Sequence, residues 1–237
     1  MEWSEDGFVL CTRRHGEGDL VLSLLTRDHG RHAGLVKGGA GRRAAGLYEP
    51  GNRLRALWRA RLVEHLGHFS CEALSPTAAA LLDDPLRLAA LTSAAALAET
   101  ALPEREPHPR AYDGFAGLIH ALLSPADTID WAARYVFWEL DLLAELGFGL
   151  DLGRCAVSGE TEDLTFVSPA SGRAVSQSVA GPYRDRLLPL PAFITGGSAD
   201  LPAIRQGLAL TGSFLERHAL RQMPAARARF LARLHRA

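Results

Sequence analysis

A chain of 237 residues, 47% hydrophobic and 22% charged, has the balance of an ordinary globular protein of one large domain or two small ones, which excludes collagen, a coiled coil and a disordered chain. The three cysteines, Cys11, Cys71 and Cys155, are sparse and far apart, which is typical of a reducing compartment rather than of a disulfide framework. The opening residues, MEWSEDG, are acidic where a signal peptide needs positive charge, and the most apolar stretch, around 86–102, is too short to cross a bilayer. We therefore expect a cytoplasmic protein that does not enter a membrane.

Five short runs rich in valine, leucine and aromatic residues occupy about the first 75 residues: GFVLCTRRH, LVLSLLT, RHAGLVK, RLRALWRARL and HLGHFSCEAL. They are separated by the turn sequences HGEGD, RDHG, GGAGRRAAG with EPGN, and Val63-Glu64. Apolar residues alternate with polar ones, as in Leu54, Ala56 and Trp58. Five strands of this length cannot bury both faces as an open sheet, so we predict a small closed barrel resembling the OB fold.

Alanine and leucine at helical spacing dominate from residue 76 onward, in TAAALLDD, PLRLAALTSAAALAETAL, PRAYDGFAGLIHALLS and DTIDWAARYVFWELDLLAELGF. Asp83-Asp84-Pro85, Ser124-Pro125 and Asp127-Thr128 are expected to cap or stop these helices, and Gly147 to end the last of them. Within that helix, Glu139 and Asp141 are placed on an exposed turn by their spacing. A small insert at about 150–180 has β-like pieces in RCAVSGE, LTFVSP and GRAVS, and helices return from Leu201 to the end. The fold class is therefore α+β, with domains at 1–75 and 76–237.

The net charge of the chain is close to zero, but the basic residues are unevenly distributed. From residue 13 to residue 61 there are eleven basic and four acidic residues. The high arginine content also fits a GC-rich genome, so this asymmetry alone only hints at nucleic acid. The basic residues are Arg13, Arg14, Arg27, Arg31, Lys37, Arg42, Arg43, Arg53, Arg55, Arg59 and Arg61.

The glycine-rich segment 38–44 matches a dinucleotide fingerprint only formally, because no helix is expected to begin there and no βαβ alternation follows. Lys37 precedes the glycines, whereas a phosphate-binding P-loop needs its lysine after them. The favoured interpretation is a basic hairpin that contacts phosphates through Lys37, Arg42 and Arg43. The alternative is a solvated turn that happens to carry arginines.

Metal and catalytic sites are not indicated by any spacing in the chain. His65, His68 and Cys71 recur every three residues, which on a strand sends neighbours to opposite faces. Cys155 opens a segment like a zinc ribbon, but Ser158, Ser176 and Val179 stand where its partner ligands would be. No nucleophile elbow or paired-carboxylate pattern stands out, so neither a metal, a cofactor nor an enzymatic activity is expected.

Two aromatic residues lie among the arginines and offer surfaces on which bases could stack. Trp58 alternates with Arg55 and Arg59, so it is expected to point into the barrel. For Tyr48 both interpretations stay open.

These segments together resemble the RecO family of bacterial recombination mediators. The resemblance rests on GFVLCTRRHGEGDLVLSLLTRDHGRHAGLVKGG, on Pro50-Gly51 followed by Arg59, on RYVFWELDLLAELGF, and on SGRAVSQ followed by PYRDRLLPLP. It covers essentially the whole chain in the family's order.

The resemblance implies an N-terminal OB fold, a helical domain and a zinc-ribbon-like insert, which here lacks the metal ligands and would rely on packing, with Phe166 and Val167 in its core. It also implies binding of single- and double-stranded DNA, annealing of complementary strands, and action with RecR to help load RecA onto DNA coated by the single-stranded DNA-binding protein (SSB), in the cytoplasm at the nucleoid. The DNA-contacting residues carried over from the resemblance are Arg13, Arg14, Lys37, Arg42 and Arg43, and Arg59 and Arg61 of the fourth run are added to them.

Two other functions compete with a DNA-binding protein. A pure adaptor would bind partner proteins through its helical half and make no direct DNA contact. An enzyme would need polar side chains with shifted pKa values converging in a cleft.

Overall fold

The computed structural model describes residues 1–41, 44 and 46–236. The chain forms two compact units, Met1–Leu123 with Pro224–Ala237, and Ser124–Met223. The domain boundary expected near residue 76 follows a different criterion, the change from strands to helices, and it stays a prediction.

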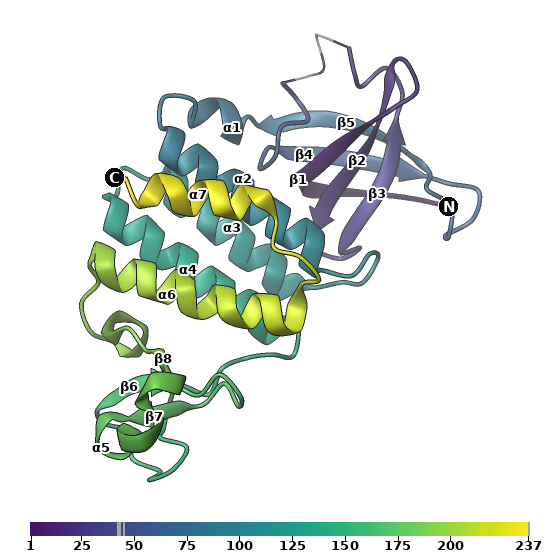
Figure 1. The fold of residues 1–237 in the computed structure, drawn as a ribbon. Helices are drawn as coiled ribbons and strands as arrows, with labels where there is room; N and C mark the ends of the chain where they lie inside the picture. Colours follow the sequence, from purple (N-terminus) through teal and green to yellow (C-terminus); the bar gives the residue numbers. More distant parts are fainter. Residues whose placement is uncertain (42–43, 45, 237) are drawn as a thin grey trace. The chain divides into compact units, whose positions relative to one another are not determined.

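The first unit contains the expected five-stranded barrel, closed in the order β1-β2-β3-β5-β4 (Figure 1). All neighbouring strands are antiparallel except β3 and β5, which pair in parallel through Leu35 and His68. Each of the five predicted runs contributes one strand, so the predicted α+β fold with an N-terminal OB-like barrel is confirmed. The strands are β1 (Glu2–His15), β2 (Asp19–Thr26), β3 (Arg31–Val36), β4 (Arg53–Arg59) and β5 (His68–Ser75).

The first strand is buried on both of its faces. The side chain of Val9 lies in the barrel core, whereas the Phe8 ring lies 5.2 Å from Tyr112 and 5.5 Å from Phe115 of the neighbouring helix. The register of β1 against β2 shifts between Val9 and Cys11, a β-bulge that breaks the simple alternation expected for this run. The barrel therefore has an inner core and an outer face that is covered by helices.

The described residues of this unit also form the helices α1 (Thr77–Ala80), α2 (Pro85–Ala101), α3 (Pro109–Leu123) and α7 (Ala225–Leu234). Helix α2 contacts both β1 and α7. The side chain of Asp84 accepts hydrogen bonds from the N–H groups of Leu86 and Arg87, which confirms its predicted role as a helix cap. Asn52, directly before β4, holds the β3–β4 connection in place. Its side chain accepts a hydrogen bond from Ala78 N at 3.0 Å and donates to the carbonyls of Gly46 and Leu47, so it links this connection to α1.

The second unit is built on α4 (Thr128–Glu145), which packs against α6 (Leu201–Phe214) and is followed by the insert. The insert contains a small sheet in the order β7-β6-β8, formed by β6 (Leu164–Val167), β7 (Ala174–Ser176) and β8 (Leu188–Pro189), with the short helix α5 (Gln177–Ala180) beside it. Phe166 and Val167 are buried as predicted. Shorter helical turns are η1 (Gly181–Arg186), η2 (Ala192–Thr195) and the π-helical turn η3 (Leu215–Ala219).

Two local expectations for the second unit are wrong. The segment RCAVSGE, at 154–160, forms turns rather than a strand, because its backbone folds around Cys155. Glu139 is fully buried rather than exposed, because α6 covers that side of α4 and Thr211 donates its hydroxyl hydrogen bond to the Glu139 carboxylate.

Of the helices in the described part of the chain, none is both long and apolar enough to span a bilayer.

Candidate nucleic-acid interface

The predicted DNA-contacting residues lie at opposite ends of the barrel. Arg14 pairs with Leu20 across the β1–β2 ladder, and Leu20 pairs with Val36, the residue before Lys37. Arg59 instead pairs with Glu2, at the other end of β1. We call the first location, residues 13–19 with 37–41, the hairpin end.

The hairpin end is held together by two hydrogen bonds that backbone N–H groups donate. Gly38 N donates to the Asp19 carboxylate at 2.8 Å, and Ala40 N donates to the carbonyl of Gly18 at 3.0 Å. The start of the β3–β4 connection is thus attached to the β1–β2 turn, which brings Lys37 toward the end of β1 that carries Arg13 and Arg14. Arg42 and Arg43 follow in the same connection and lie outside the described residues.

Most arginines of the basic segment have acidic partners that come from outside that segment. Glu99 of α2 accepts from Arg13 and Arg31, both at 3.4 Å, and Asp6 of β1 accepts from Arg53 and Arg55. The charge excess counted along the sequence is therefore largely compensated in the fold. Two further pairs are Arg27–Asp113 at 3.1 Å and Arg59–Glu2 at 2.8 Å.

Three of the predicted contacts keep an uncompensated charge. Arg14, Lys37 and Arg61 are exposed, and within the part of the chain that the structure describes none of them has an ion-pair partner. Arg13, whose side chain is 74% exposed, is held only by a surface ion pair, and such pairs are typically worth about 0–1 kcal/mol. A phosphate group could therefore replace Glu99 as the partner of Arg13 at little cost.

Glu99 also fastens α2 to the barrel. Ser23 Oγ donates to its second carboxylate oxygen at 2.5 Å. Burial, together with the Glu99 carboxylate, raises the pKa of the Cys11 thiol to about 11. Cys11 is therefore a protonated thiol near neutral pH, and its role is packing rather than chemistry.

The two aromatic residues among the arginines are both part of the barrel core. Trp58 is 2% exposed, as predicted, and its indole N–H donates to the carbonyl of Leu66 at 3.0 Å. Tyr48 is 7% exposed, and burial raises its pKa to about 12. Neither ring is therefore free to stack on a base from the surface.

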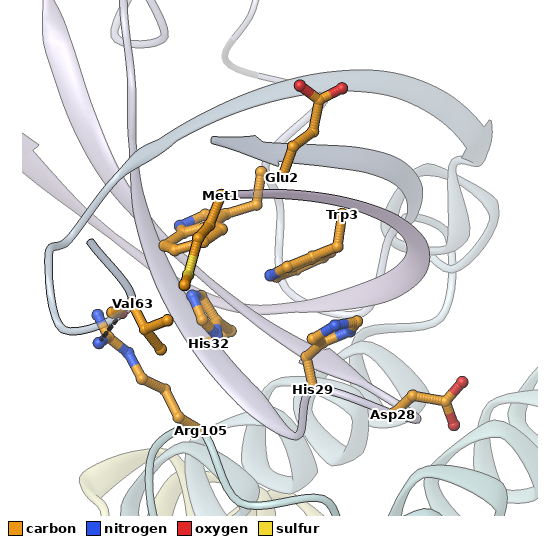
Figure 2. Close-up of a pocket in the computed structure, with 9 residues that line it drawn as sticks. Met1, Glu2, Trp3, Asp28, His29, His32, Val63 and Arg105 are labelled. Atoms are coloured by element: carbon orange, nitrogen blue, oxygen red, sulfur yellow. Dashed lines mark hydrogen bonds between the residues drawn. The ribbon is translucent and has the colours of Figure 1, made fainter. Parts of the chain in front are cut away.

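A different aromatic residue lines a hollow at the end of the barrel opposite the hairpin end (Figure 2). Trp3 is half-buried, stacks on His29 with ring centroids 4.1 Å apart, and lies 5.8 Å from the Trp58 ring. We call this space, of about 480 Å³, the Trp3 hollow; its walls include Trp3, His29, His32, Trp58, Val63 and Arg105.

Sequence reasoning missed the Trp3 hollow because its residues come from widely separated segments.

The residues weighed as metal ligands are spread along the end of β5 and the connection before it. His65 lies in that connection, and His68 and Cys71 lie on β5. Cys71 packs against the barrel core, and burial raises its pKa to about 12. No group of three or more potential ligands is found among the described residues.

In the insert, Cys155 forms the centre of a small hydrogen-bonded cluster. The cysteine is 1% exposed, and its sulfur accepts from the N–H groups of Val157, Ser158 and Ser176 and from the Ser176 hydroxyl, all at 3.4–3.5 Å. Ser158 and Ser176 are two of the positions where partner ligands would be expected, and Val179, the third, packs against the same cluster. Hydrogen-bond donors therefore surround the Cys155 sulfur where, in a zinc ribbon, a metal ion would bind it.

Burial acts to raise the pKa of Cys155, but the hydrogen bonds from Ser158 and Ser176 outweigh it and lower the pKa from 9.0 to about 6. An unfolded chain then binds more protons than the folded one between about pH 6 and pH 9, so the stability contributed by the thiolate grows over that range and is lost as the pH falls through 6.

Replacing Cys155 by Ala is expected to leave several buried N–H groups without an acceptor and to destabilise the insert by about 2 kcal/mol. Hydrogen exchange of the amides of residues 157, 158 and 176 measures this locally, and unfolding between pH 6 and pH 9 shows whether the pH dependence is lost. Cys71→Ala, which removes a thiol without such donors, is the control. Equal exchange rates and equal pH profiles in the two variants would contradict the role given to Cys155.

Family models match nearly the whole chain. The model described as recombination protein O N terminal matches residues 1–76, and the one described as recombination protein O C terminal matches residues 82–227.

The chain is also similar to curated proteins named DNA repair protein RecO. It is 55% identical to that of Rhodospirillum centenum over 244 residues, covering 100% of this chain and 96% of the relative. The relative from Rhodospirillum rubrum is 49% identical, with 100% and 97% covered, and the one from Methylobacterium nodulans is 49% identical, with 92% and 90% covered.

Proposed function

Because the chain belongs to the RecO family of DNA repair proteins, we propose that it binds single- and double-stranded DNA through its barrel and anneals complementary strands. The proposal extends to the family's partners: the chain would act with RecR and with SSB-coated DNA to assist the loading of RecA. These partner roles follow from the family and carry no residue assignment in this chain.

The observation that supports direct DNA contact is the uncompensated charge at the hairpin end. Most barrel arginines are neutralised by carboxylates, whereas Arg14 and Lys37 point their charge at solvent beside the loop that carries Arg42 and Arg43. Cations that contact phosphates release condensed counterions from DNA, which provides affinity without regard to sequence. Glu17 and Asp19 bring two negative charges to the same end, and Asp19 serves there as the acceptor of the Gly38 N–H.

We propose further that the chain is not an enzyme. Annealing needs no bond to be broken: two flexible strands must be held close with their charges screened and their bases free to pair. A protein surface that contacts phosphates and leaves the base edges open meets this requirement. The half-buried thiols of Cys11 and Cys71 have raised pKa values, which makes them unsuited to nucleophilic attack, and Cys155, whose pKa is lowered to about 6, is only 1% exposed.

The proposal is tested by mixing two complementary oligonucleotides, one carrying a fluorophore and the other a quencher, with and without the full chain. We expect pairing to be accelerated without nucleotide or metal at about 50 mM salt, and the acceleration to be largely lost by about 200 mM. A chain that binds neither strand and leaves the pairing rate unchanged at low salt is a protein adaptor instead.

A further inference from the structure

The Trp3 hollow combines aromatic walls with an apolar rim. Its walls are Trp3, Trp58 and His32, with the His32 ring 4.8 Å from Trp58 and 5.1 Å from Trp3, nearly perpendicular to both. The β4–β5 connection contributes Val63, which is 50% exposed, to the rim. Its volume of about 480 Å³ lies in the range of about 300–1,000 Å³ that is usual for small-ligand sites.

Buried nitrogen atoms of residues that line this hollow make no hydrogen bond within the described chain. His32 is 4% exposed, and neither of its ring nitrogens makes a hydrogen bond. The Nε atom of Arg105 is likewise buried without a hydrogen bond, and it forms only a long ion pair of 3.7 Å with the Glu104 carboxylate. Buried groups of this kind cost folding free energy, so each needs a reason to persist.

His32 is a neutral imidazole near pH 7. Burial and the charges of Arg105 and His29 lower its pKa to about 4. A neutral ring offers one donor and one acceptor, which is the complement of a hydrogen-bonding edge of a nucleobase. In Figure 2 the Met1 side chain reaches across the opening toward this ring, and Met1 is 67% exposed, so a rotamer change of that flexible side chain would open the way to His32.

Arg105 is held at the edge of the hollow in an unusual backbone conformation. Its φ is +63°, a region that non-glycine residues rarely adopt. Its N–H donates to the carbonyl of Arg31 at 2.7 Å, and its guanidinium donates to the carbonyls of Val63 and His65. Strain that is maintained in this way is typical of functional sites, and here it fixes both the guanidinium and the rim.

A second, shallower hollow of about 660 Å³ lies next to the first and shares Met1 and Glu2 with it. Arg59, Arg61 and His68 line it, and Arg61 has no ion-pair partner among the described residues. Arg59 is paired with Glu2 at 2.8 Å, so Arg61 supplies the uncompensated positive charge of this hollow. An aromatic hollow beside two arginines matches the two halves of a nucleotide, its base and its phosphate.

We propose that the Trp3 hollow receives one unpaired base of single-stranded DNA, while Arg61 and Arg59 hold the adjoining phosphates; this rests on the proposed DNA-binding function. The base enters after the Met1 side chain moves, packs against the half-buried Trp3 ring, and takes its hydrogen bonds from His32 and from Arg105 Nε–H. A base that is paired in a duplex cannot enter, so the hollow favours unpaired strands.

The test compares two DNA strands of about 15 nucleotides, one of thymidines and one whose central nucleotides are abasic. The two strands carry the same number of phosphates and differ only in the missing bases. We expect the wild-type chain to bind the thymidine strand about tenfold more tightly than the abasic strand. His32→Phe fills the same space without nitrogens, so it should abolish this preference, leave binding of the abasic strand unchanged, and not lower the unfolding temperature. Val63→Glu should also abolish the preference, and because Val63 is exposed at the rim, this substitution should leave the unfolding temperature unchanged. His120→Phe on α3 is the matched control and should keep it.

The outcomes separate the two proposals. If the chain binds both strands equally, or if His32→Phe and Val63→Glu both retain the preference, the base site is wrong and the DNA-binding function stands. If neither strand binds at low salt, the proposed function itself fails. If thymidine monophosphate changes the Trp fluorescence of the chain at concentrations where the thymidine strand has no effect, the hollow is a site for a free nucleotide and the proposal is overturned.

Discussion

Replacing Gly30 by Ala is expected to destabilise the first unit by roughly 3–5 kcal/mol, among the largest effects of a single methyl group. Gly30 has φ +64° in the β2–β3 turn, and a Cβ atom there would lie 1.9 Å from the carbonyl oxygen of Glu106. That oxygen belongs to the backbone, so it cannot move aside like the end of a side chain. The N–H and hydroxyl of Thr26 both donate to the Gly30 carbonyl at 2.9 Å, which holds the turn in place.

Gly16→Ala is the matched control, because Gly16 has φ +60° but a Cβ there would meet nothing within 4 Å. It should cost only the conformational term of about 1 kcal/mol. Urea unfolding of the two variants measures the difference. Equal losses of stability would show that the contact between Gly30 and Glu106 is not tight. They would also contradict the placement of the segment that carries Arg105 into the Trp3 hollow.

Replacing Arg14 and Lys37 together by Ala is expected to weaken binding of single-stranded DNA roughly 50-fold at about 50 mM salt, because two phosphate contacts and their released counterions are lost. Neither side chain has an ion-pair partner in the described chain, so their removal leaves no carboxylate unpaired there. Stability should therefore change little. Fluorescence anisotropy with a labelled oligonucleotide measures the affinity, and thermal unfolding checks the fold.

The matched control removes the same charge from arginines that are already paired. Arg53 and Arg55 share Asp6, and Arg53 also lies over the Phe8 ring. If DNA affinity depended on net charge alone, Arg53→Ala with Arg55→Ala would weaken binding as much as the hairpin-end pair. We expect a several-fold smaller loss, and an equal loss would contradict a local contact.

The fold could be predicted from the sequence because its signals are local. Alternation and turn residues located all five strands of the barrel, and Asp84 and Gly147 marked helix boundaries as expected. Glu139 was misplaced because its burial depends on Thr211, a residue of another helix that no local spacing reveals.

The candidate interface was only partly predictable for the same reason. Counting charges from residue 13 to residue 61 left out Glu2, Asp6, Glu99 and Asp113, the carboxylates that neutralise most of the arginines. Only the strand register separates the hairpin end from the end that carries Arg59. The Trp3 hollow depends on the positive φ of Arg105 and on residues from separate strands, which no motif in the sequence connects.

The most direct test of the central claim, that the barrel binds DNA through uncompensated cations at the hairpin end, is the salt dependence of single-stranded DNA affinity. For the wild-type chain the logarithm of the association constant should fall linearly with the logarithm of salt concentration, and the slope of the Arg14→Ala, Lys37→Ala variant should be shallower by about 1.4. Wild-type binding that is absent at the lowest salt, or identical slopes for the two proteins, would contradict the claim.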